Sequence, residues 1–331
     1  MICLVTGVHF SSHTTTLRLH NGRLMRSLFH TRSSALLLGL LLSSAVSAPV
    51  SPHGPSNPTI KKPSSGITNP PAAQPKLRTT LVRISDPAGD ALLVVPPDCS
   101  VMSCPLLLVS HPLGAIPEYG IDFVKHAGYA QFLERFSQAG YALLLSSDGG
   151  RETWGNMNAL ENTYRVWNAA LSRFDYSGQT FSLGVSMGAL PATLLGLTGR
   201  IPLEGTLTIG GVLNLPDIYR RSDPTYPASL TRAYSLPAQV SDAQLAYATV
   251  PHDPIGGILF FSKLDIPYLA IGSRGDTRVP LERNAAAFVR QMQPFQSASR
   301  VLEVTGPHLS AAHFSEEVSR AALEFLGKYR R

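Results

Sequence analysis

Charged side chains are scarce in this sequence. They make up 15% of the 331 residues, whereas hydrophobic residues make up 44%, a balance typical of a globular chain and not of a disordered one. Four of the 28 basic side chains lie before Pro49 and none of the 22 acidic ones does, so the remainder carries a net charge of about +2. A body this close to neutral argues against a nucleic-acid partner. The length suffices for one large domain preceded by a leader.

The N-terminal segment lacks an apolar run long enough to cross a bilayer. The run Ala35–Leu42 is too short for that, follows a positively charged stretch that begins at Arg26, and precedes the small residues of Val46–Ala48. This order is typical of a secretory signal peptide. We therefore expect residues 1–48 to form a cleaved leader, which leaves a secreted or periplasmic protein without a membrane span. A membrane anchor or a buried helix is the alternative.

Apolar periodicity is almost absent from residues 49–76. A segment of this kind cannot bury enough surface to fold, so we expect an extended linker between the leader and a folded domain over residues 77–331. Proline recurs throughout the linker, at Pro49, Pro52, Pro55, Pro58, Pro63, Pro70, Pro71 and Pro75.

Cysteine is also scarce. Of the three cysteines, Cys3 lies in the expected leader, so a processed protein keeps only Cys99 and Cys104. A remaining pair in an oxidising compartment predicts a disulfide that closes a small loop. Two unpaired thiols are the alternative. A zinc site is disfavoured because two cysteines without a nearby histidine supply half of a zinc shell at best, so we expect no metal.

From Leu81 onward, strand-like and helix-like segments alternate, which predicts an α/β sheet. Several strands are almost continuously apolar, as strands buried on both faces should be. The expected strands are 81–85, 91–95, 105–110, 141–146, 180–185, 205–209, 267–271 and 300–304. The expected helices are 129–139, 190–197, 281–292 and 316–329, together with an amphipathic helix whose apolar face carries Leu160, Tyr164, Trp167, Leu171 and Phe174.

One segment interrupts this alternation. Residues 212–262 are rich in proline and tyrosine and are too long for a plain connection in a compact domain. The segment follows a strand that should end at the active face of the sheet, so we expect a cap over the active site. An insertion packed on the side of the domain is the alternative.

A nucleophile signal lies between a strand and a helix. Gly184–Gly188 reads Gly-Val-Ser-Met-Gly, follows an apolar strand and opens a helix, which is the context a nucleophile elbow requires. A strained turn would project the hydroxyl of Ser186 above the sheet, and the helix N-terminus would favour a developing anion. A strand-to-helix turn of purely structural origin is the alternative.

A serine hydroxyl needs a base, and the base needs an orienting carboxylate. Asp276 lies in a turn just after a strand, where its carboxylate could reach an imidazole; capping of the following helix is its alternative role. Asp265 is a rival, but it precedes the same strand and should lie at the opposite end of the sheet. For the base we favour His308, which closely follows the last strand, over His313.

The oxyanion of a tetrahedral intermediate needs two backbone donors. The amide of Met187, directly after the nucleophile, should supply one. The loop that follows the strand ending at Ser110 should supply the other. Pro112 has no amide hydrogen, so we assign this donor to Leu113. We interpret His111 as a residue that braces this loop, without a catalytic role.

The order of these motifs resembles the α/β-hydrolase superfamily. The resemblance extends from about Leu81 to the C-terminus, and Asp148–Asn156 is additionally similar to a loop in bacterial esterase-like and dienelactone-hydrolase-like members. Pro112 departs from the pattern, because many members have glycine there. The matching segments are Ser110–Gly114, Gly184–Gly188, Gly275–Pro280 and Gly306–His308.

The resemblance implies an α/β-hydrolase fold with a mostly parallel eight-stranded sheet flanked by helices, and acyl-transfer chemistry at an ester. We therefore expect a secreted serine esterase that uses Ser186, His308 and Asp276, needs no cofactor, and acts on a small-molecule or polymeric ester. A peptidase or acyltransferase on the same triad is one alternative. A catalytically inactive hydrolase fold that serves as a binding module is the other.

Overall fold

The computed structural model describes residues 80–331, except residues 88, 116–127 and 222–224. Contacts along the chain divide it into two units, residues 1–67 and residues 68–331. The expected leader and linker, including Cys3, lie outside the described residues and stay predictions.

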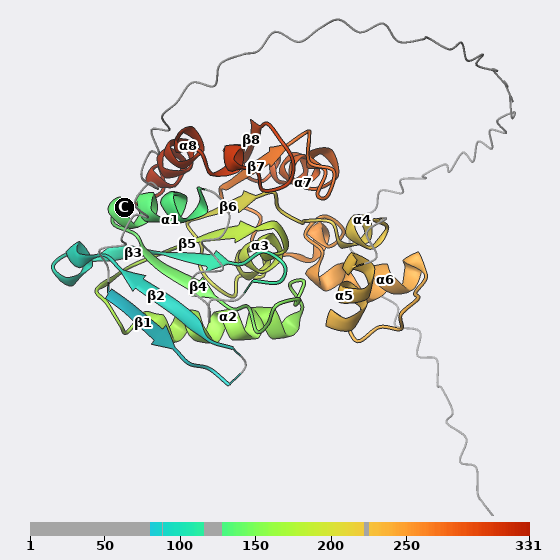
Figure 1. Ribbon diagram of the computed structural model, residues 1–331, viewed down its shortest axis with the longest axis horizontal. Coiled ribbons are helices and arrows are strands. Elements are labelled where there is room, and N and C mark those ends of the chain that lie inside the picture. The colour runs from blue at the N-terminus through green and yellow to red at the C-terminus, as the bar shows by residue number, and fades with distance from the viewer. Residues whose placement is uncertain (1–79, 88, 116–127, 222–224) are drawn as a thin grey trace, which may run out of the picture. The chain divides into compact units, whose positions relative to one another are not determined.

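An eight-stranded sheet forms the centre of the second unit, in the order β1-β2-β4-β3-β5-β6-β7-β8 (Figure 1). The strands β1 and β2 pair antiparallel, as do β2 and β4, and every other neighbouring pair is parallel. The prediction of a mostly parallel eight-stranded sheet is therefore confirmed. The strands are β1 Thr80–Ile84, β2 Ala91–Val95, β3 Cys104–Ser110, β4 Ala142–Ser146, β5 Tyr176–Val185, β6 Gly205–Ile209, β7 Tyr268–Ser273 and β8 Arg300–Val304.

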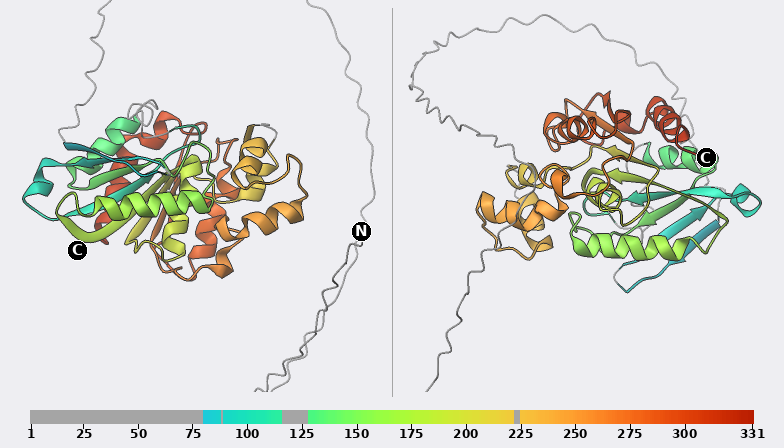
Figure 2. Two further views of the ribbon diagram at one scale, coloured as in Figure 1. Left: turned by 90° about the horizontal axis from the view of Figure 1, so that it is seen from below. Right: turned by 180° about the vertical axis from the view of Figure 1, so that it is seen from behind.

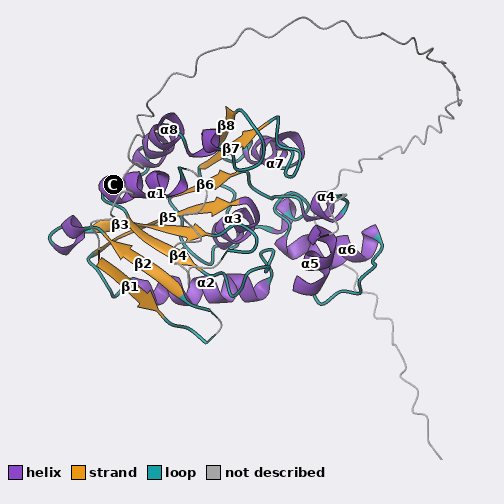
Figure 3. Cartoon of the chain, viewed as in Figure 1, coloured by secondary structure: helices purple, strands orange, loops and turns teal. Residues whose placement is uncertain are grey.

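Helices cover both faces of the sheet, which explains the unbroken apolar runs of the central strands. Successive side chains of a strand point to opposite faces. Leu106 and Leu108 of β3 belong to the core shared with helices α2 (Met157–Ala170) and α3 (Ala189–Leu197). Leu107 and Val109 belong to the core shared with α1 (Tyr129–Gln138) and α8 (Glu316–Gly327), and α7 (Ala285–Met292) packs beside β7 and β8. Figure 3 shows this alternation of helices and strands.

Two predicted helices are wrong in part. The amphipathic helix ends at Ala170, and Phe174 lies beyond it with its ring 6.0 Å from that of Tyr176. The helix predicted over 281–292 is broken at Asn284, whose φ of −120° and ψ of −96° are not helical. The Asn284 side-chain oxygen accepts from the backbone amides of Leu213 and Asn214, so a contact between distant segments overrides the local periodicity.

In the segment between β6 and β7, the described residues form three short helices and two single turns of 3-10 helix. Figures 1 and 2 show α4, α5 and α6 grouped beside one end of the sheet. Asn214 caps α4 and Ser241 caps α6 through side-chain oxygens that accept backbone amides, so polar residues in this segment define its helices. The elements are α4 Leu215–Tyr219, α5 Thr225–Ala233, α6 Asp242–Thr249, η5 Val250–His252 and η6 Ile258–Phe260.

Cys99 and Cys104 form a disulfide with a Cα–Cα distance of 5.5 Å. It joins a short 3-10 helix, Pro97–Ser100, to the first residue of β3. Across the described part of the chain, no helix has the length and apolar character needed to span a membrane.

Candidate active site

A strained turn carries Ser186 at the carboxyl end of β5. Ser186 has a φ of 53°, in the left-handed region that is rare for residues other than glycine. The chain continues as a short 3-10 helix, Ser186–Gly188, and then as α3. Such strain costs on the order of 1–3 kcal/mol and clusters at functional sites, where the surrounding structure maintains it. The hydroxyl of Ser186 is thus held at the point where the chain leaves the sheet.

Two glycines permit this turn because neighbouring backbone approaches them closely. A Cβ atom on Gly184 would lie 2.4 Å from the Cα of Ala189. A Cβ atom on Gly188 would lie 2.4 Å from the carbonyl oxygen of Ser110. Neither distance leaves room for a side chain, so Gly188 allows the start of α3 to pack against the end of β3.

Ser186, His308 and Asp276 form one hydrogen-bonded series. The Oγ atom of Ser186 lies 2.9 Å from Nε2 of His308, and Nδ1 of His308 lies 2.6 Å from Oδ2 of Asp276. Asp276 follows β7 and His308 follows β8, so the ends of three parallel strands supply the three side chains. Leu309, directly after His308, also has a positive φ of 51°.

The two oxygens of Asp276 have separate partners. Its Oδ1 accepts hydrogen bonds from the backbone amides of Arg278 and Val279, each at 2.9 Å, while Oδ2 faces His308. The carboxylate therefore both orders the turn before Pro280 and orients the imidazole. A carboxylate only accepts, so Nδ1 of His308 donates to it and Nε2 is left to accept from Ser186.

His313 has a different environment from His308. Its side chain is buried, and its Nδ1 lies 3.2 Å from Oγ of Ser310. Burial, and secondly the nearby His308, lower the pKa of His313. Of the two histidines singled out in the sequence, the one within hydrogen-bond distance of Ser186 is His308.

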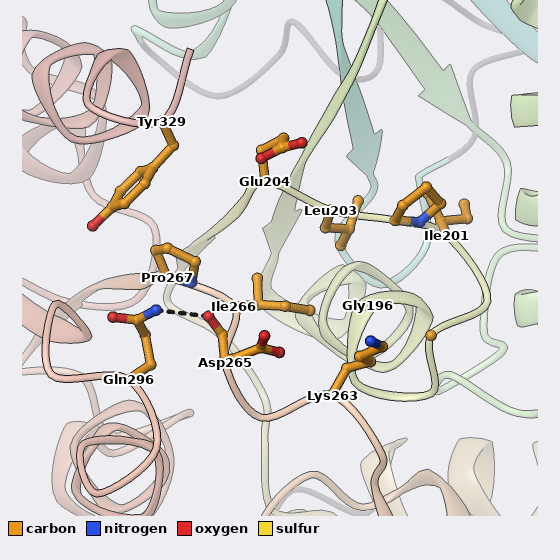
Figure 4. A pocket seen from close by; sticks show the side chains of 12 residues that line it. Gly196, Ile201, Leu203, Glu204, Lys263, Asp265, Ile266, Pro267, Gln296 and Tyr329 are labelled. Atoms are coloured by element: carbon orange, nitrogen blue, oxygen red, sulfur yellow. Dashed lines mark hydrogen bonds between the residues drawn. The ribbon is translucent and has the colours of Figure 1, made fainter. Parts of the chain in front are cut away.

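Asp265, the rival acid, lies at the other end of β7. It precedes that strand and lines a separate pocket of about 430 Å³ with Glu204 and Tyr329. Figure 4 shows Asp265 in this pocket, with the Gln296 side chain donating to its backbone oxygen at 2.6 Å. The expectation that Asp265 and Asp276 occupy opposite ends of the strand is confirmed.

A pocket of about 290 Å³ opens over Ser186 and His308. Pro112 and Leu113, from the loop after β3, form part of its wall. Among the described residues, no protein acceptor receives a hydrogen bond from the amide of Leu113. That amide is therefore free to donate to a bound group, as an oxyanion donor must be. Met187, the other expected donor, is fully buried directly after Ser186.

His111 braces the loop that carries Leu113, as expected from the sequence. Its ring is fully buried, with Nδ1 2.7 Å from the carbonyl oxygen of Pro112. Nε2 lies 2.8 Å from the carbonyl oxygen of Ser147 and 3.0 Å from that of Gly150. The ring thus connects the loop after β3 to the loop after β4.

Several solved structures resemble this chain, whereas no protein-family model and no curated protein matches its sequence. Est1E from Butyrivibrio proteoclasticus, solved with ferulic acid bound, matches with 20% identity and a TM-score of 0.55, over 75% of this chain and 98% of that one. FphF, a fluorophosphonate-binding serine hydrolase of Staphylococcus aureus, matches with 14% identity and a TM-score of 0.52, over 76% and 98%. The esterase Pf2001 of Pyrococcus furiosus matches with 16% identity and a TM-score of 0.51, over 76% and 91%.

The chain has the α/β-hydrolase fold. At these identities the similarity concerns architecture alone. The fold gives the site a definite location, because in an open parallel sheet ligands bind beyond the carboxyl ends of the strands. Ser186, Asp276 and His308 all follow such ends.

Four residues at this edge of the α/β-hydrolase fold were not identified from the sequence. Thr225 and Tyr226, from α5, and Arg278 line the pocket over Ser186. Asp148 follows β4 and accepts from the hydroxyls of Ser110 and Thr163. Asp148 has a sequence signal, because β3 and β4 were both predicted and their ends are neighbours in a parallel pair. The other three depend on how α5 and the turn after β7 fold over the site.

Proposed function

We propose that this protein is a serine hydrolase that cleaves carboxylic esters. The observation that carries the proposal is the series Ser186–His308–Asp276, with distances of 2.9 and 2.6 Å, beneath a pocket. A nucleophile, a base and an orienting acid in hydrogen-bond contact are the requirements for acyl transfer to a serine. No metal or organic cofactor is needed for this chemistry.

In the proposed reaction, Oγ of Ser186 attacks the ester carbonyl while Nε2 of His308 takes the hydroxyl proton. Asp276 holds the ring and stabilises the imidazolium that forms. The amides of Met187 and Leu113 would hold the oxyanion. Collapse of the tetrahedral intermediate breaks the bond to the alcohol, which leaves with the proton from His308. Water, deprotonated by His308, then attacks the acyl-enzyme, and Ser186 recovers its proton as the acid departs.

The pocket supports a modest substrate group near the scissile bond. Its volume of about 290 Å³ is at the lower end of the range for small-molecule sites. Leu113, Tyr226 and Leu309 give it an apolar wall. Since Tyr226 comes from the insertion between β6 and β7, we propose that this insertion caps the site.

Export to the periplasm or outside the cell is part of the proposal. The composition of the leader and the Cys99–Cys104 disulfide both suit an oxidising compartment. An exported hydrolase would meet exogenous esters, either small molecules or polymers.

The proposal is tested with a matched ester and amide. The purified protein and Ser186→Ala are each given an aryl ester and the anilide of the same acid. We expect hydrolysis of the ester by the wild type, at least about 100-fold slower turnover of the anilide, and activity reduced by about 10⁴-fold or more in the variant. Faster anilide cleavage would favour the peptidase alternative. No turnover by a folded wild type would favour a binding module.

A further inference from the structure

Among the described residues, Arg278 is the one fixed charge in the wall of the pocket over Ser186. Besides His308, the other described lining residues are neutral: Pro112, Leu113, Ser186, Thr225, Tyr226 and Leu309. The Arg278 side chain is exposed, and within the part of the chain that the structure describes it has no ion pair and no side-chain hydrogen bond. The backbone amide of Arg278 donates to the carboxylate of Asp276, and this hydrogen bond fixes the backbone of Arg278 next to the site.

Arg274, on the same loop, provides a contrast. It is also exposed, yet it pairs with Glu282 at 2.6 Å and with Glu303 at 2.9 Å, and it does not line the pocket. The loop therefore holds one arginine whose charge is compensated within the protein, and one that lines the pocket over Ser186 and has no ion pair among the described residues. Guanidinium groups bind carboxylates through paired, charge-assisted hydrogen bonds.

We propose that Arg278 selects esters that carry a negatively charged group, a carboxylate above all, close to the scissile bond. This inference rests on the proposed function, because it names the substrate class of the same site. A carboxylate on the acyl or alcohol part would pair with Arg278 while the ester carbonyl sits over Ser186. The charge would be bound within a small pocket that offers no competing acidic side chain among the described residues.

The test compares a carboxylate with its uncharged isostere. The substrates are monoaryl esters of succinic, glutaric and adipic acid. Each is measured beside the same aryl ester in which an uncharged carboxamide replaces the free carboxylate, and the spontaneous rate of hydrolysis is subtracted. For the chain length that fits, we expect kcat/KM to be about tenfold higher for the carboxylate, mainly through KM. Arg278→Gln should remove this preference, because it lowers kcat/KM for the carboxylate about tenfold more than for the carboxamide, and Arg278→Lys should retain part of it.

Arg274→Gln is the matched control, because it removes the same charge from the same loop outside the pocket. It should leave the preference intact. Equal losses on both substrates in Arg278→Gln, or no preference in the wild type, would overturn the assignment of Arg278 while Ser186-dependent hydrolysis continued. If neither substrate is hydrolysed and Ser186 does not react with an active-site probe, the proposed function itself fails.

A second inference comes from the atoms around His111. Both of its ring nitrogens face carbonyl oxygens, at 2.7 Å for Nδ1 and at 2.8 and 3.0 Å for Nε2. A carbonyl oxygen only accepts, and a neutral imidazole carries one N–H and one acceptor nitrogen. The observed contacts are all satisfied only when both nitrogens carry a proton.

A counter-ion for such a cation is present. Nε2 of His111 lies 3.9 Å from Oδ2 of Asp148, and both side chains are fully buried. The backbone amide of His111 donates to the same Oδ2, and the hydroxyls of Ser110 and Thr163 donate to Oδ1. Burial raises the pKa of Asp148, and the His111 charge and these hydroxyls oppose the rise.

We infer that His111, with both ring nitrogens directed at backbone carbonyls and Asp148 beside it, positions the loop bearing the Leu113 amide. Other ionisable groups nearby are the phenol of Tyr129, which interacts with Asp148, and the guanidinium of Arg151, which donates to the carbonyl of Gly114 at 3.0 Å. The ion pair would fix the carbonyl of Pro112, and with it the direction of the adjacent amide of Leu113. His111 and Asp148 are thus positioning residues, without contact with substrate.

Nitrogen NMR of the protein labelled at histidine tests this directly, with the His111 signals assigned by their loss in His111→Gln. Both ring nitrogens should give donor-type signals at neutral pH, because each faces a carbonyl oxygen, which only accepts. An acceptor-type signal from either nitrogen at neutral pH would overturn the inference, whatever the activity. In folded Asp148→Asn, kcat should fall by at least about tenfold with KM little changed, because a displaced oxyanion donor acts on the transition state. An unchanged kcat would remove the positioning role.

Discussion

At the scale of single residues, the two oxygens of Asp276 have different hydrogen-bond partners, so its substitution by asparagine should alter one contact and preserve the other. In Asp276→Asn, the side-chain oxygen of the new amide would accept from the backbone amides of Arg278 and Val279, as Oδ1 does now. The NH₂ group of that amide would then face Nδ1 of His308 and force this nitrogen to accept. Nε2 would carry the proton and could no longer receive one from Ser186.

We therefore predict that Asp276→Asn folds normally and loses about 10⁴-fold in kcat, because the base is held in the wrong tautomer. Asp265→Asn is the control, since Asp265 lies at the other end of β7 and its carboxylate is exposed. Steady-state ester hydrolysis measures both variants. Similar losses in the two variants, or no loss in Asp276→Asn, would contradict the tautomer account.

The sequence predicts the site best where a functional residue directly follows a strand. Ser186, Asp276 and His308 are each marked by a strand end in the sequence, and these ends meet because the strands are parallel neighbours or near neighbours. Arg278 and Tyr226 could not be found in the same way. Their relation to the pocket depends on how a turn and an inserted helix fold, which no periodicity in the sequence specifies.

At the scale of elements, the contact between α3 and β3 depends on Gly188. We predict that Gly188→Ala costs about 1–3 kcal/mol of stability, because its Cβ would meet the Ser110 carbonyl oxygen at 2.4 Å and would displace backbone. Activity should fall as well, since the displacement separates Met187 from the loop of Leu113. Denaturant unfolding and ester hydrolysis check both parts.

Gly327→Ala serves as the matched change, because nothing lies within 4 Å of a Cβ at that position. Its stability should stay within about 0.5 kcal/mol of the wild type. If Gly188→Ala proves equally mild, the close packing of α3 on β3 is not a constraint on the turn.

The segment between β6 and β7 carries a buried acid, Asp253. Burial raises its pKa from 3.8 to about 6, against the opposing effect of backbone amides from Gly256, Ile255 and Leu215. The folded state therefore binds this proton more tightly than the unfolded chain does. The contribution of Asp253 to stability should fall as pH rises from about 4 to about 6, by at most about 3 kcal/mol.

Asp253→Asn should remove that dependence. Denaturant unfolding at several pH values, with wild type and variant side by side, measures the difference. We expect the variant to gain stability relative to the wild type as pH rises through this window, and to hold a constant difference above it. A difference that does not change with pH would mean that Asp253 ionises alike in both states.

Some ends of helices and strands could be predicted from the sequence, and others could not. β2, β6 and β8 were predicted with their observed bounds, because each is a short segment rich in β-branched or leucine side chains. The break at Asn284 could not be foreseen, since it depends on amides of Leu213 and Asn214, which lie 71 and 70 residues away in the chain. The end of α2 at Ala170 was missed because Leu171 and Phe174 stay apolar and pack against the same core.

At the scale of the whole molecule, we predict that the N-terminal leader is removed during export. We expect the exported protein to begin at Pro49, because the small residues before it suit a signal peptidase. Intact-mass measurement and N-terminal sequencing of protein recovered from the periplasm or medium check this. Retention of Ala35–Leu42 in the recovered protein would favour the membrane-anchor alternative.

The central claim is that Ser186 is an activated nucleophile. We would treat the purified protein with a fluorophosphonate probe, digest it, and locate the modified residue by mass spectrometry, with folded Ser186→Ala beside it. The account predicts one modified residue, Ser186, and no labelling of the variant. An unlabelled, folded wild type, or equal labelling of Ser186→Ala, would contradict the claim that Ser186, His308 and Asp276 act as a catalytic triad.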